Sequence, residues 1–165
     1  MLASNPILRS PFVIALFLGL TLAGCATKNK LPDNSGDLVN GAAPGSQQDF
    51  TVNVGDRVFF ETDSSILTPQ ARQTLDRQAQ WLLQYPNYPI TVEGHADERG
   101  TREYNLALGA RRAAATRDYL ASRGIGANRI RTISFGKERP VAVCNDISCW
   151  SQNRRTVTVL AAPTG

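Results

Sequence analysis

The segment GHADERGTREYN, at residues 94–105, joins two patterns that together predict the architecture of the chain. Before it, residues 90–93 (ITVE) alternate apolar and polar side chains as a half-buried strand does. After it, the chain is rich in Ala and Leu and lacks Pro, which predicts a helix over about 101–122. The segment is therefore expected to be a strand-to-helix connection that carries charges of both signs.

Within and after this connection, Asp97 and Arg112 form a pair that could recognise a small zwitterion. Asp97 stands where the strand ends, and Asn105 and Arg112, seven residues apart, share one face of the helix. A carboxylate binds an ammonium group, and a planar guanidinium binds a carboxylate through two parallel hydrogen bonds. The alternative is a structural salt bridge between loop and helix.

The rest of the folded part is predicted from the same kinds of pattern. A helix is expected from Thr68, as N-cap, and Pro69, at the first helical position, to just before Pro86. A stripe of residues at helical spacing is expected to face the core from the next helix: Leu106, Gly109, Ala113, Thr116 and Leu120. The expected strands cover about residues 50–60, 90–93, 129–135 and 154–160. The order β-α-β-α-β-β predicts an α+β fold with a mixed β-sheet and two main helices packed on one face.

The first 24 residues are typical of an export signal. They contain one basic residue, Arg9, and an apolar run over residues 11–22 that is short for a membrane span. The run ends in LAGC, residues 22–25, which resembles the lipobox of bacterial lipoproteins and implies lipid on Cys25. The alternative is an ordinary signal peptide with an unrelated Cys. Residues 25–49, rich in Gly, Pro, Ser and Asn, are expected to form a flexible tether, and residues 50–165 the folded domain.

Composition excludes some functions. The 165 residues carry a net charge of +4, too mild to indicate nucleic-acid binding.

Cys144 and Cys149 lie in a late loop, and an exported protein meets oxidising conditions, so a local disulfide is expected. The single His95, two residues from Asp97, lacks the further ligands that a metal site needs, so neither metal nor cofactor is expected.

The central motif, GHADERGTREYNLALGARR at residues 94–112, resembles the signature of the OmpA-like peptidoglycan-binding domains, and most closely that of the peptidoglycan-associated lipoproteins. The resemblance extends over about residues 50–160. It implies a non-enzymatic outer-membrane lipoprotein whose domain faces the periplasm, binds peptidoglycan and works with TolB and TolA of the Tol system. It also implies that Asp97 and Arg112 hold the free end of meso-diaminopimelate in the stem peptide, which carries one ammonium and one carboxylate.

The same resemblance places Asp63, Ser64 and Arg99 in that pocket, while Asn105 is expected to brace the loop with ligand contact possible. Thr62 departs from the family, which often has an aromatic or large apolar residue there. Arg154-Arg155 could bind an anion, or could pair locally at the border of the site. Two other functions remain as alternatives: an accessory module of a cell-wall hydrolase, and a secreted binding module without an anchor.

Overall fold

The computed structural model describes residues 42–163. The predicted signal segment 1–24, the predicted lipid site Cys25 and the predicted tether as far as residue 41 lie outside the described residues. Within residues 42–163, no helix is both long enough and apolar enough to cross a membrane.

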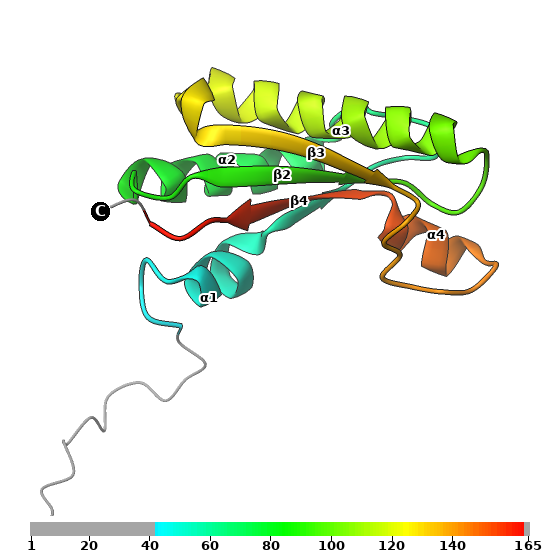
Figure 1. The fold of residues 1–165 in the computed structure, drawn as a ribbon. Helices are drawn as coiled ribbons and strands as arrows, with labels where there is room; N and C mark the ends of the chain where they lie inside the picture. The colour runs from blue at the N-terminus through cyan, green and yellow to red at the C-terminus, as the bar shows by residue number, and fades with distance from the viewer. Residues whose placement is uncertain (1–41, 164–165) are drawn as a thin grey trace, which may run out of the picture. The chain divides into compact units, whose positions relative to one another are not determined.

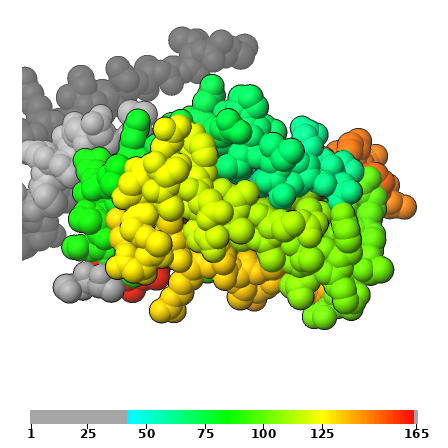
Figure 2. All heavy atoms as spheres, turned by 90° about the horizontal axis from the view of Figure 1, so that it is seen from above, coloured from blue at the N-terminus to red at the C-terminus, as the bar shows by residue number. Residues whose placement is uncertain are grey.

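The elements, in chain order, are α1 Gln47–Asp49, η1 Phe50–Gly55, β1 Arg57–Phe59, α2 Pro69–Gln84, β2 Ile90–His95, α3 Arg102–Ser122, η2 Ala127–Arg129, β3 Ile130–Gly136, α4 Ile147–Asn153 and β4 Arg155–Leu160. The sheet has the order β1-β4-β2-β3, with β2 parallel to β3 and β4 antiparallel to both β1 and β2. Figure 1 shows α2 and α3 on the same side of this sheet, and Figure 2 shows α3 lying between α2 and β3. The predicted α+β class, with a mixed sheet and two main helices on one face, is confirmed.

Both main helices begin at a threonine cap, and Thr68 is the cap that the sequence predicts. Thr68 Oγ1 accepts a hydrogen bond from Ala71 N at 3.1 Å, and Thr101 Oγ1 accepts one from Tyr104 N at 3.1 Å. Each threonine therefore satisfies an amide that the first helical turn would leave without a partner.

The start of the domain differs from the prediction. Residues 50–55, predicted as the first half of a strand, form the helical turn η1, residues 47–49 form α1, and Val52 is exposed. The reason is a long-range contact: Asp49 Oδ2 accepts a hydrogen bond from Trp81 Nε1 at 2.8 Å, and Phe50 packs on the Trp81 ring with centroids 4.9 Å apart. Residues 42–49, expected at the end of the tether, thus pack on the domain.

The meeting of β2 and α3 sets the position of the central connection. A Cβ on Gly94 would lie 1.9 Å from the Gly109 carbonyl oxygen, so only glycine allows these backbones to approach this closely. The contact also fixes which face of α3 is buried. Leu106, predicted to face the core, is exposed, and Leu108 and Arg112 are buried instead.

His95, at the end of β2, is a buried titratable group. It is 2% exposed, and its ring stacks on Phe135 with centroids 5.6 Å apart. Neither ring nitrogen has a hydrogen-bond partner among the described residues, and the Glu93 carboxylate lies 3.6 Å from Nε2. Burial, followed by the positive charges of Arg155 and Arg139, lowers the pKa of His95 to about 4. The imidazole is therefore neutral in the folded protein at neutral pH.

We predict that acid destabilises the domain through His95. The pKa of His95 in the folded protein lies below the ordinary value of 6.5. As the pH falls from about 6.5 towards 4, the unfolded chain therefore binds a proton at His95 and the folded chain does not. Between pH 7 and pH 4 this difference lowers the free energy of unfolding by about 3 kcal/mol. His95→Phe keeps a ring against Phe135 but cannot titrate. Urea unfolding across this range should show a shallower pH dependence for the variant, whereas parallel curves would contradict the assignment.

Candidate functional site

A cavity of about 250 Å³ lies beside the connection between β2 and α3. Its walls come from the segment after β1, from the connection itself and from the first turns of α3: Thr62, Asp63, Asp97, Arg99, Gly100, Tyr104, Asn105 and Leu108. Four of the six residues predicted to bind ligand therefore line one cavity. The other two, Ser64 and Arg112, do not line it.

Asp97 is buried in the wall of the cavity, where it is 7% exposed, and its carboxylate accepts four hydrogen bonds. Oδ1 accepts from the backbone N (3.2 Å) and the Nε (3.1 Å) of Arg99, and Oδ2 accepts from Arg99 Nη2 (2.7 Å) and Arg154 Nη1 (3.4 Å). Burial alone would raise the pKa of Asp97, but the hydrogen bonds and charge of Arg99, with the contribution of Arg154, outweigh it and lower the pKa. The carboxylate is therefore ionised, and four donors occupy its two oxygens.

Arg99 is the accessible half of this ion pair, with a side chain that is 40% exposed. Its guanidinium carbon lies 4.2 Å from the centroid of the Trp150 ring, and Nη2 is 3.5 Å from Thr62 Oγ1. Trp150 also donates from Nε1 to Glu98 Oε1 at 3.0 Å. The connection is thus supported by α4, a helix that occupies part of the region predicted as the late loop around Cys144 and Cys149.

Arg112 lies behind the cavity and is 0% exposed. It donates to three backbone carbonyls: Nε to Ser64 O (2.8 Å), Nη1 to His95 O (2.8 Å) and Nη2 to Glu61 O (3.2 Å). Burial lowers the pKa of Arg112 to about 10, so the side chain remains charged at neutral pH. Within the described residues, no ion pair joins Arg112 to Asp97. Asp97 instead pairs with Arg99, a partner that the sequence analysis did not predict.

The remaining predicted residues shape the rim. Asp63 has a positive φ of 53°, and its Oδ1 accepts a short hydrogen bond from the hydroxyl of Tyr104. That hydrogen bond is the main cause that raises the pKa of Tyr104. Asn105 donates from Nδ2 to the Arg99 carbonyl at 2.7 Å and so holds the loop closed. Ser64 Oγ accepts from Ile66 N at 3.1 Å, which stabilises the turn instead of facing the cavity.

The late cysteines and the arginine pair support these walls. Cys144 and Cys149 are joined in a disulfide with Cα atoms 5.7 Å apart, directly before Trp150. Arg154 donates from Nε to the Phe60 carbonyl at 2.9 Å, and Arg155 donates from Nη2 to the Arg139 carbonyl at 3.2 Å. In residues 42–163, no group of three His, Cys, Asp or Glu side chains could hold a metal ion.

Four of the lining residues, Thr62, Gly100, Tyr104 and Leu108, were not among the residues predicted to bind ligand, and neither was the supporting Trp150. Tyr104 and Leu108 lie within the central motif and four residues apart, on one face of the predicted helix, so a helical projection beside Asn105 would have found them. Trp150 carried no such signal, because it reaches Glu98 from 52 residues away in sequence.

The chain is similar to known proteins of one family. The model of the OmpA family matches residues 59–154. The peptidoglycan-associated lipoprotein of Rhizobium meliloti is 71% identical, over 93% of this chain and 89% of its own length. The crystal structure of the peptidoglycan-associated lipoprotein from Burkholderia pseudomallei is 42% identical, with a TM-score of 0.63 over 64% of this chain and 90% of that one.

A more distant structure shares the fold alone. The C-terminal domain of Helicobacter pylori MotB is 22% identical, with a TM-score of 0.60 over 65% of this chain and 84% of that one. By the extent of the family match and the identity to the Rhizobium protein, the chain belongs to the OmpA family and, within it, to the peptidoglycan-associated lipoproteins.

Proposed function

We propose that this chain binds peptidoglycan noncovalently through the meso-diaminopimelate of the stem peptide, and so tethers the outer membrane to the cell wall. The role is binding and not catalysis. The proposal rests on one observation: the ionised carboxylate of Asp97 and the accessible guanidinium of Arg99 line the same cavity and pair with each other. The names of the relatives, which call them peptidoglycan-associated, support the same conclusion.

The size of the cavity suits one end of a peptide side chain. Its volume of about 250 Å³ is below the roughly 300–1,000 Å³ of pockets that enclose a whole drug-sized ligand. The free end of diaminopimelate presents an ammonium and a carboxylate on one carbon, and these charges are complementary to Asp97 and Arg99.

Binding at this site requires an exchange of partners. The four acceptor positions of the Asp97 carboxylate already receive four donors, so a ligand ammonium must replace one of them. The side chain of Arg99 is the exposed donor, whereas Arg154 is buried. We infer that the Arg99 guanidinium turns from Asp97 to the ligand carboxylate while the ligand ammonium takes its place. Arg112 would hold the walls of the cavity during this exchange without contacting the ligand.

Asp97→Asn should weaken binding of a stem tripeptide that ends in meso-diaminopimelate by at least about thirty-fold, because the ligand ammonium loses its counter-charge. Isothermal titration of the purified chain measures this. The matched control is Asp118→Asn, since Asp118 is exposed on α3 and, within residues 42–163, forms its one ion pair with Arg117. A tripeptide with Lys in place of diaminopimelate lacks the distal carboxylate and should bind poorly to the unmodified chain. Equal affinity for the two tripeptides would show that no guanidinium reads that carboxylate.

The anchor and the Tol partners complete the proposal. We infer that Cys25 carries lipid in the outer membrane and that the domain engages TolB and TolA at the periplasmic side. Cys25→Ala should release the chain from the membrane fraction, while Ser35→Ala, in the same segment, should not. The released chain should still co-purify with TolB, because its domain is intact. Retention of the Cys25→Ala chain in washed membranes would contradict the anchor, and loss of TolB on release would contradict a TolB surface within the domain.

A further inference from the structure

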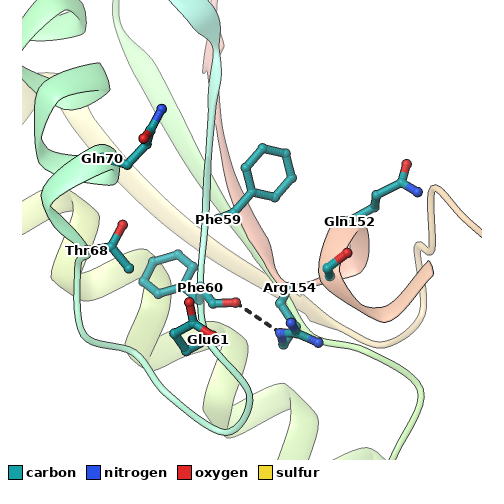
Figure 3. Close-up of a pocket in the computed structure, with 8 residues that line it drawn as sticks. Phe59, Phe60, Glu61, Thr68, Gln70, Gln152 and Arg154 are labelled. Carbon is teal, nitrogen blue, oxygen red and sulfur yellow. Dashed lines mark hydrogen bonds between the residues drawn. The ribbon is translucent and has the colours of Figure 1, made fainter. Parts of the chain in front are cut away.

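A second cavity, of about 400 Å³, is lined by the end of β1 and the residues after it, by the start of α2 and by α4. Figure 3 shows it between Gln70, from the start of α2, and Gln152, from α4, with the ring of Phe59 between them. Glu61 and Arg154 line it as well. It has no part in the exchange between Asp97 and Arg99, so its lining requires a separate explanation.

The lining combines one flat apolar surface with several polar groups around it. Phe59 is 48% exposed, although it is the last residue of a strand. Within residues 42–163, the side chains of Gln70 and Glu61 make no hydrogen bond, and Gln152 uses only its Nε2, which donates to Ser148 O at 3.0 Å. These amides and this carboxylate are therefore available to a ligand. An exposed ring bordered by amide and carboxylate groups matches a sugar, which has an apolar ring face and polar groups around its edge.

Consecutive residues of one segment line the two cavities. Residues 59–61 line the second, and residues 62–63 line the first. Arg154 joins them: it lines the second cavity, and its Nη1 donates to Asp97 Oδ2 in the first at 3.4 Å. The chain from Phe59 to Asp63 spans at most about 14 Å. In peptidoglycan, diaminopimelate is the third residue of the stem, so the sugar lies about 10 Å or slightly more away along an extended peptide.

We propose that this second cavity holds an N-acetylhexosamine of the glycan strand whose stem peptide occupies the first. The inference rests on the proposed function, because it needs a stem peptide at Asp97. Phe59 stacks on the sugar ring, Gln70 and Gln152 bond its hydroxyl and acetamido groups, and Arg154 lies between the two parts of the ligand.

Isothermal titration with two ligands tests this. One is the free stem tripeptide ending in meso-diaminopimelate, and the other is the same tripeptide on a GlcNAc–MurNAc disaccharide. The unmodified chain should bind the disaccharide form about tenfold more tightly, through stacking and one or two additional hydrogen bonds. Phe59→Ala should remove this preference and leave the affinity for the free tripeptide unchanged, and Phe59→Tyr should restore the preference. Gln70→Ala, at an exposed helix position, should reduce the preference without affecting the fold.

The control is Ile66→Ala, which removes an exposed apolar side chain that lines neither cavity and should keep the full preference. If the unmodified chain binds both ligands equally, or if Phe59→Ala weakens both to the same extent, the glycan subsite is wrong and the stem-peptide site stands. If the free tripeptide does not bind at all, both proposals fail. Retention of the preference in both Phe59→Ala and Gln70→Ala would place the sugar elsewhere.

Discussion

The Arg112 guanidinium is the interaction on which the site depends. From the interior of α3 it donates to the carbonyls of Glu61 and Ser64, after β1, and of His95, at the end of β2. A hydrogen bond from a charged donor contributes about 1.5–3 kcal/mol, and of the three bonds the one to His95 is buried, so that this carbonyl would cost a similar amount if it were left without a donor. The desolvation that lowers the pKa of Arg112 to about 10 is offset by these three bonds, and the charge is retained. Three segments that are distant in sequence are thereby held in one arrangement.

This brace separates the fixed part of the site from the exchangeable part. The carbonyls of Glu61 and Ser64 are fixed by Arg112, so Thr62 and Asp63 between them form a stable wall. Arg99, by contrast, contacts the half-buried Trp150 ring and Asp97 with a side chain that is itself 40% exposed, and it can change partner without disturbing the core. The second cavity shares the fixed wall, because residues 59–61 belong to the same segment.

Sequence reasoning predicted most of the fold because its signals were local. Thr68-Pro69 and Thr101 mark helix starts through contacts with their own first turns. The strand prediction was wrong about residues 50–55, because Val52 and Val54 alternate as in a strand while the decisive bond, Asp49 to Trp81, spans 32 residues. In the site, sequence reasoning correctly placed Asp97 and Asn105 together. It did not predict the surroundings of Arg112, because this side chain bonds to carbonyls 48 and 51 residues away in sequence. No spacing rule encodes contacts of that kind.

The central claim is that Arg99 reads the ligand carboxylate and that Arg112 only positions the walls. The most direct test is the ratio of affinities for the diaminopimelate and Lys tripeptides, measured for Arg112→Lys and for Arg99→Lys. Arg112→Lys should lower both affinities together and keep the ratio, because an ammonium cannot hold all three carbonyls but does not face the ligand. Arg99→Lys should reduce the ratio sharply, because it loses the planar fork. A ratio that is lost in Arg112→Lys and kept in Arg99→Lys would contradict the account.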